Sequence, residues 1–292
     1  PNMDGSTLAA FIEASGAECC AGLDVIAKLT NGKVYVCQES GRRLPSGNDD
    51  RLSVQEFAGL HPAGLPGTHI HFLDPVSASK TVWFVNYQDV IAIGDLFLTG
   101  TLNTTRVVAL GGPGVERPRL LRTIIGANLE ELTAGELDGA DNRLISGSVL
   151  SGHFAESPVA FLGRYHLQVS VLPEDRERRL IGYLTPGKDR HSVFPIYLSK
   201  WLGEKGIRFS TSLNGSPRSM VPIGTYESVM PMDILPTQLL RSLLVGDLDS
   251  AINLGCLELD EDDVALCTYA CPAKYEYGPV LRAVLDTIEK EG

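Results

Sequence analysis

The pattern of hydrophobic and polar positions divides the chain into three stretches. In residues 1–105, apolar residues recur at helical spacing from Ser6 to Leu29, and runs at 33–37, 68–72 and 83–86 have the composition of strands. Alternating helices and strands of this kind are typical of an α/β sheet. Because so few strands are predicted, we expect an incomplete α/β domain that lacks the beginning of its sheet.

From Arg106 onward the pattern changes to short apolar runs separated by turns. Strands are predicted at residues 106–110, 119–125, 143–147 and 165–172, with a short helix at 127–132. Two strands, a helix and further strands in this order outline a β-grasp module, which we place at residues 106–186. The Gly-Gly-Pro-Gly segment at 111–114 lacks the spacing of a phosphate-binding loop, so we expect a turn there.

The last stretch, residues 187–292, opens with connectors rich in aromatic residues and glycine and ends in helices. Pro236 is typical of the start of a helix, and Gly246 of its end. Asp260 is expected to cap the next helix, and the final helix opens near Gly278 and carries an apolar stripe. These signals predict a helical C-terminal domain.

Two segments of this helical stretch have the spacing of the cluster-binding runs of bacterial ferredoxins, C-x2-C-x2-C-x3-C-P. One run ends at Cys271-Pro272 and the other at Met230-Pro231, 41 residues earlier, and a fixed offset of this kind is typical of an internal repeat. The eight ligand positions fall at Met220, Ile223, Tyr226, Met230, Glu261, Val264, Cys267 and Cys271. Only two of them are cysteines, and Cys256 adds a third thiol at most. We therefore expect the architecture of an iron–sulfur domain without iron, with Cys267 and Cys271 as buried small residues.

Four tyrosines lie close to these runs in the sequence, at positions 226, 269, 275 and 277. We expect them to fill the volume that clusters and their cysteines would occupy. Aromatic side chains also line quinone slots, and this alternative stays open.

Composition narrows the classes of partner. The chain has 25 basic and 36 acidic residues, a formal charge of −11, which argues against nucleic acid as a partner. Its 43% apolar residues are enough for sizeable cores, but no apolar run approaches the roughly 20 residues that cross a bilayer. Six dispersed cysteines indicate reduced thiols and a cytoplasmic protein.

One candidate ligand-binding segment runs from His61 to His71; it begins in a turn and continues into the predicted strand at 68–72. On that strand His69 and His71 would share a face, but a zinc site needs a third protein ligand, and none is evident. Ligands commonly bind at the rim of α/β sheets, so we treat these residues as ligand-loop candidates: His61, Gly64, Gly67, His69 and His71. We find no catalytic constellation and no metal-ligand set in the spacing of Ser, His, Asp, Glu and Cys.

The chain resembles the NqrA family, which comprises the A subunits of bacterial Na+-translocating NADH:quinone reductases. The resemblance is carried by residues 60–69 (LHPAGLPGTH), 86–92, 145–152 (ISGSVLSG), 162–171 (LGRYHLQVSV), 219–224, 258–262 and 274–278. More remotely, the layout is similar to the RnfC component of the Rnf complex and to the flavin-binding subunit of complex I. The family implies a Rossmann-like α/β domain, truncated here at its N-terminal side and lying at 1–105. It also implies a β-grasp module of the soluble-ligand-binding type at 106–186 and a ferredoxin-like helical domain without clusters at 187–292.

The resemblance also implies a function. It makes the chain a fragment, without a lipoyl-like N-terminal part, of a peripheral subunit on the cytoplasmic face of the inner membrane. The complex oxidises NADH, reduces ubiquinone and moves Na+, with flavins and iron–sulfur centres in other subunits and no cofactor in this chain. The expected partners are those other subunits, especially the membrane subunits, together with ubiquinone. Two alternatives are a nucleotide- or flavin-binding module that receives electrons and a pure assembly scaffold.

Overall fold

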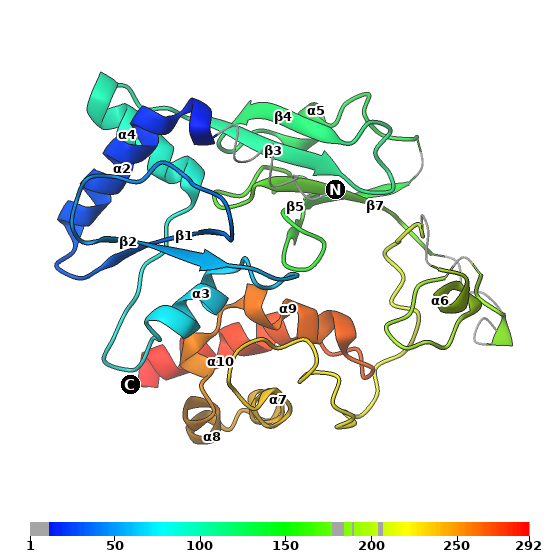
Figure 1. Ribbon diagram of the computed structural model, residues 1–292. Helices are drawn as coiled ribbons and strands as arrows, with labels where there is room; N and C mark the ends of the chain where they lie inside the picture. The colour runs from blue at the N-terminus through cyan, green and yellow to red at the C-terminus, as the bar shows by residue number, and fades with distance from the viewer. Residues whose placement is uncertain (1–11, 140, 177–183, 189, 204–206, 292) are drawn as a thin grey trace. The chain divides into compact units, whose positions relative to one another are not determined.

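The computed structural model describes residues 12–139, 141–176, 184–188, 190–203 and 207–291. The chain folds as two compact units, one of residues 106–216 and one that combines residues 3–105 with 217–292 (Figure 1). The first and last thirds of the chain therefore share a unit, which the sequence pattern did not indicate. The division into three domains at residues 105 and 186 remains a prediction.

Two helices, α2 (Gly16–Leu29) and α4 (Tyr87–Thr99), lie side by side in the α/β part of the combined unit (Figure 1). Gly22 and Gly94 make this approach feasible, because a Cβ atom at either would lie within 2.0 Å of a backbone carbonyl oxygen of the facing helix. Asn86 caps α4 by accepting a hydrogen bond from a backbone N–H in its first turn. Helix α2 confirms the predicted helical spacing up to Leu29, while residues 6–11 of that prediction lie outside the described residues.

The sheet of this part contains two parallel strands, β1 (Val34–Glu39) and β2 (Leu52–Phe57). The first confirms the run predicted at 33–37, and the second was not anticipated. Parallel strands need a long connection, and here the polar segment between them supplies it.

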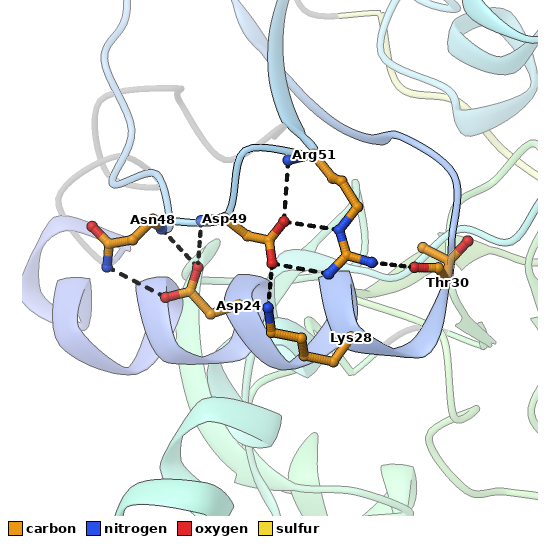
Figure 2. Close-up of polar contacts among 6 residues, drawn as sticks. All are labelled: Asp24, Lys28, Thr30, Asn48, Asp49 and Arg51. Carbon is orange, nitrogen blue, oxygen red and sulfur yellow. Dashed lines mark hydrogen bonds and ion pairs between the residues drawn. The ribbon is translucent and has the colours of Figure 1, made fainter.

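A polar network holds that connection against the end of α2 (Figure 2). The carboxylate of Asp49 accepts hydrogen bonds from Lys28 Nζ at 2.6 Å and Arg51 Nε at 2.9 Å, while Arg51 also donates to the carbonyl oxygen of Thr30 at 2.5 Å. Hydrogen bonds from Arg51 and Lys28 hold the pKa of Asp49 well below its usual range. Asp24 accepts the backbone N–H of Asn48 at 2.7 Å. The network fixes where the chain turns into β2.

Two of the predicted strands are wrong. The segment 68–72 lies within helix α3 (Pro66–Leu73), where the backbone N–H of Asp74 donates to the carbonyl oxygen of Ile70 at 2.8 Å. A short apolar run does not distinguish helix from strand by periodicity, and Pro66 at the first turn is a helix-start signal. Residues 83–86 form no strand but lead into α4, with Trp83 88% exposed.

The unit of residues 106–216 is built on a five-stranded sheet. Its strands are β3 (Thr105–Gly111), β4 (Arg119–Ile124), β5 (Asn142–Ser146), β6 (His153–Phe154) and β7 (Gln168–Pro173), in the order β4-β3-β7-β5-β6. Strand β7 pairs parallel with β3 and antiparallel with β5. The short helices α5 (Leu129–Leu132) and α6 (Leu198–Leu202) complete the described elements. Val108, Leu110, Leu129 and Val171 are fully buried in its core. The four predicted strands are confirmed, and the helix predicted at 127–132 is shorter.

The C-terminal part of the combined unit is helical, as predicted. Its elements are α7 (Pro236–Val245), α8 (Leu248–Asn253), the 3-10 helix η2 (Cys256–Glu258), α9 (Glu261–Ala270) and α10 (Tyr277–Glu291). Pro236 stands in the first turn of α7, and Gly246 ends it in the left-handed conformation at φ 70°. Asp260 caps α9 as predicted. Among the residues that the structure describes, no helix is long and apolar enough to span a membrane.

Candidate functional site

The five ligand-loop candidates lie in the turn before α3 and on α3 itself. His61 and Gly64 are exposed residues of the turn, and Gly67, His69 and His71 belong to the helix. Residues two apart on an α-helix point about 200° apart around its axis. His69 and His71 therefore do not share a face, and the paired arrangement predicted for them is wrong.

His69 is directed back at the preceding turn. Its Nε2 donates to the carbonyl oxygen of Ala63 at 2.9 Å, because a carbonyl only accepts, and its ring lies 4.1 Å from that of Phe57. Partial burial lowers the pKa of His69, against an opposing hydrogen bond to Ala63. His61 is exposed as a residue, but contact of its ring with neighbouring atoms still removes enough water to lower its pKa, and the charge of Asp262 opposes that shift.

His71 is directed at the helical part of the same unit. Its Nε2 accepts the backbone N–H of Asp233 at 3.0 Å, and its Nδ1 lies 2.8 Å from a carboxylate oxygen of Glu258. Since a backbone N–H only donates, the ring proton must be on Nδ1, from which it is donated to Glu258. Both ring nitrogens of His71 are occupied, which removes it as a metal ligand in this conformation.

Gly67 provides a second contact between α3 and the helical part. A Cβ atom at this position would lie 2.2 and 2.3 Å from the two carboxylate oxygens of Asp263, the residue that completes the capping box of α9. Burial raises the pKa of Asp263 to about 6. A Cβ atom at Gly64, by contrast, would meet nothing within 4 Å. These contacts give the α3 region a structural role, and ligand binding by its residues remains a prediction.

Two of the ferredoxin-like positions, one from each run, meet in the structure. In two-cluster ferredoxins the last cysteine of one run ligates the cluster held by the other run. Cys271 ends the second run, and its Sγ lies 3.2 Å from the hydroxyl of Tyr226, the third ligand position of the first run. The hydroxyl of Tyr277 completes a triangle, 2.9 Å from that of Tyr226 and 3.4 Å from Cys271 Sγ. Tyr226 and Cys271, which occupy two ligand positions of one cluster, thus form a hydrogen-bonded triangle with Tyr277.

The positions of the second would-be cluster are apolar or turned outward. Val264 and Cys267 are fully buried, and Met230 packs against the same core. Glu261 instead pairs with the guanidinium of Arg282 at 2.5 Å, and this interaction lowers its pKa to about 2. Neither set of positions can present four converging thiolates, because only two of the eight are cysteines.

The two remaining cysteines of the runs differ in environment. Burial raises the pKa of Cys267 to about 12, so it behaves as a small apolar residue, as predicted. Cys271 follows the last residue of α9. Burial would raise its pKa, but hydrogen bonds from the hydroxyls of Tyr226 and Tyr277 and from the backbone of Tyr275 and Ala273 together lower it. All six cysteines are free. Among the described residues, no group of three or more His, Cys, Asp or Glu is placed to hold a metal ion.

The expected role of the tyrosines as core fillers is confirmed for Tyr226 and Tyr277, which are fully buried with their rings edge to face. Tyr275 packs against the same core in part. Tyr269 is 43% exposed, and its assignment to the core is wrong.

One arrangement was missed entirely. Ser146 and His166 are 20 residues apart, and the sheet brings Ser146 Oγ to 2.7 Å from His166 Nδ1. They line a cavity of about 410 Å³ in the unit of residues 106–216. Spacing alone contains no signal for this pair, although both residues lie in segments that carry the family resemblance.

Comparisons with known proteins agree with that resemblance. Residues 5–102 match a family model described as "NqrA second alpha/beta domain", and residues 107–157 match one described as "NQRA C-terminal domain".

Three relatives are each named as the A subunit of the Na(+)-translocating NADH-quinone reductase. The relative from Cellvibrio japonicus is 60% identical over 97% of this chain and 64% of its own length. Relatives from Neisseria gonorrhoeae and Klebsiella pneumoniae are 57% and 58% identical over 99% of this chain and 66% of their own. The chain thus spans about two thirds of their length, and it belongs to the NqrA family, the A subunits of the Na+-translocating NADH-quinone reductase.

Proposed function

We propose that this chain serves as part of the NqrA protein of a Na+-translocating NADH-quinone reductase. The observation that carries the proposal is identity of 57–60% over nearly the whole chain to relatives of that name. The assembled complex would oxidise NADH, reduce ubiquinone and move Na+. The chain would dock, with the other subunits, on the membrane subunits at the cytoplasmic face of the inner membrane.

Within the complex, we assign this chain a role in assembly and in ubiquinone handling, without a redox centre of its own. The ferredoxin-like positions support this role, because only two of the eight are cysteines and Cys271 is hydrogen-bonded to tyrosine hydroxyls. The parallel β1–β2 pair beside α2 and α4 is consistent with a Rossmann-like domain. The order β4-β3-β7-β5-β6 is consistent with a β-grasp module.

Membership in the complex is tested by co-purification. A tagged full-length NqrA protein that contains this sequence should co-purify with the remaining reductase subunits from a strain that lacks its own NqrA, and should restore NADH-driven Na+ transport. Isolation of the tagged protein by itself, with assembled reductase absent, would contradict the proposal.

The absence of a redox centre is tested by an absorption spectrum of the purified full-length protein. A stoichiometric flavin band, or the broad visible absorption of an iron–sulfur cluster, would instead favour the electron-receiving module. Saturable, competable binding of ubiquinone would exclude a pure scaffold.

A further inference from the structure

Helix α6, in the unit of residues 106–216, carries its apolar side on the outside. Leu198, Trp201 and Leu202 are spaced by three and four residues, so they form one stripe along the helix. They are 43%, 80% and 62% exposed, whereas Ser199, which lies off the stripe, is 2% exposed. A surface helix normally buries its apolar stripe and exposes its polar residues. Helix α6 does the reverse, which indicates a surface that contacts another body.

The exposed apolar surface continues along the chain before α6. Phe194 is 38% exposed and Ile196 is 69% exposed. In the segment 184–216, Gly187 and Ser199 are the only described residues that are buried, so the segment places no large described side chain in the core of its unit. We call Phe194, Ile196 and the stripe of α6 the α6 surface. Grouped apolar side chains of this kind mark interaction sites more often than isolated ones do.

Hydrogen bonds made by the backbone and by a polar side chain hold α6 in place. The backbone N–H of Leu198 donates to the carbonyl oxygen of Pro186 at 2.8 Å. Ser199 Oγ donates to the carbonyl oxygen of Arg190. The polar residue of α6 is therefore turned to the chain that precedes the helix, and this leaves the stripe directed outward.

The segment is also tied to the end of the sheet by polar contacts. The backbone N–H of Thr211 donates to the carbonyl oxygen of Pro173, the last residue of β7, at 3.2 Å. The hydroxyl of Thr211 donates to a carboxylate oxygen of Glu174 at 2.8 Å. Attachment of the segment through hydrogen bonds leaves the α6 surface available for an external contact.

The charge of this segment is opposite in sign to that of the whole chain. Residues 184–216 contain five basic and two acidic residues, in a chain that has 25 basic and 36 acidic ones. Lys188 and Lys200 are both exposed. An anionic surface would attract this segment and repel the acidic remainder, so long-range electrostatics would turn the α6 surface toward it.

The combination of lysine and tryptophan favours a lipid surface over a protein one. Lys200 is two residues from Leu198, so it lies about 200° around the helix axis from the start of the stripe. Lysine on one side of a helix with tryptophan and leucine on the other is typical of helices that lie in a membrane interface. Protein–protein interfaces are instead depleted in lysine. The indole of Trp201 suits the headgroup layer, because its ring is apolar and its N–H is a hydrogen-bond donor.

We infer that the α6 surface rests on the anionic headgroup layer of a phospholipid membrane, with Trp201 inserted among the headgroups and the positive charge of residues 184–216 beside the lipid phosphates. The inference goes beyond the proposed function, in which other protein subunits supply the docking surface. Because only a few side chains insert, the contact is weak and reversible when this chain acts by itself.

Cosedimentation of the purified full-length protein with lipid vesicles tests the inference. Vesicles of phosphatidylglycerol and phosphatidylethanolamine should carry the protein into the pellet, and added salt should release it, because salt screens the attraction. Vesicles of phosphatidylcholine alone should bind much less. Equal binding to both kinds of vesicle, or binding to neither, would overturn the inference.

The two tryptophans of this sequence supply matched variants. Trp201→Ala removes the indole from the α6 surface, and Trp83→Ala removes one that is 88% exposed in the other unit. We expect Trp201→Ala to weaken binding to the anionic vesicles roughly tenfold or more, because it removes inserted apolar area, and Trp83→Ala to leave binding unchanged. Lys188→Gln should weaken it about fivefold through the loss of one positive charge. Equal affinities of the two tryptophan variants would contradict the assignment.

Co-purification with the other reductase subunits separates this inference from the proposed function. Trp201→Ala protein that binds vesicles like the parent protein but no longer co-purifies would make a protein the occupant of the α6 surface, and would overturn the inference. Parent protein that binds the anionic vesicles but never co-purifies would support the inference and contradict the proposed function.

Discussion

Gly67 offers a sharp test of how the α3 region is joined to the helical part of its unit. Replacing Gly67 by alanine adds one methyl group, and the position is an ordinary helical residue with no positive φ. The new Cβ would lie 2.2 Å from a carboxylate oxygen of Asp263, whereas ordinary contacts begin near 3.4 Å. The carboxylate must therefore move by about 1 Å, since the added atom is fixed to the backbone of α3.

The magnitude follows from what that movement disrupts. Asp263 Oδ2 accepts the backbone N–H of Asp260 at 2.9 Å and so completes the capping box of α9. Loss of a capping interaction costs about 1 kcal/mol, and overpacking a filled site costs about 1–3 kcal/mol. We expect Gly67→Ala to lower the free energy of unfolding by about 2–4 kcal/mol.

Gly64→Ala is the matched control, because the same methyl group would meet nothing within 4 Å in the turn that precedes α3. Gly64→Ala should leave the free energy of unfolding unchanged or raise it by up to about 1 kcal/mol, because alanine has less conformational freedom than glycine in the unfolded chain. Urea unfolding followed by circular dichroism measures both variants. In a double-mutant cycle, Asp263→Ala should relieve most of the effect of Gly67→Ala. Additive effects within about 0.5 kcal/mol would refute the clash as the cause.

Three further predictions concern buried groups. Burial raises the pKa of Asp263 from 3.8 to about 6, so the folded state binds the extra proton and stability should fall as pH rises from about 4 to 6. Asp263→Asn should remove up to about 3 kcal/mol of that pH dependence in urea unfolding, and identical profiles would contradict the burial argument. Cys267→Ser should destabilise by about 1–3 kcal/mol because it buries a hydroxyl among apolar groups. Cys271→Ser should cost less, since two tyrosine hydroxyls can bond the new oxygen, and a reversed order in urea unfolding would refute the triangle. Gly94→Ala should separate α2 from α4, because its Cβ would lie 1.8 Å from the carbonyl oxygen of Glu18, and a thermal midpoint equal to that of the parent protein would contradict this packing.

Much of the local structure was predictable where a signal acts within a few residues. Pro236 and Gly246 bound α7 because a fixed φ favours the first turn and a left-handed residue ends the last. Asp260 caps α9 because its carboxylate accepts a hydrogen bond from the backbone N–H of the next residue, Glu261. The strands β3, β4, β5 and β7 follow from their apolar runs.

Prediction was wrong where a short apolar run allowed two structures. Residues 68–72 are helical because Pro66 favours the start of a helix, and the helix then makes contacts that a strand would not. It buries Thr68 and places His69 against Ala63 in the preceding turn. It also places His71 against Asp233 and Glu258. Those last two partners lie more than 160 residues away in the sequence. No local pattern encodes such contacts, and the apolar run by itself was also compatible with a strand that has two imidazoles on one face.

The sequence by itself determined the family, the ferredoxin-like spacing and the absence of cysteine from most ligand positions, because these depend only on which residues occupy which positions. Only the tertiary structure decided what those positions now do. It brought Tyr226 to Cys271 and Tyr277, set Gly67 against Asp263, and placed Ser146 beside His166. Each of these is a contact between segments remote in sequence, and its existence depends on distances of a few ångströms that folding alone establishes.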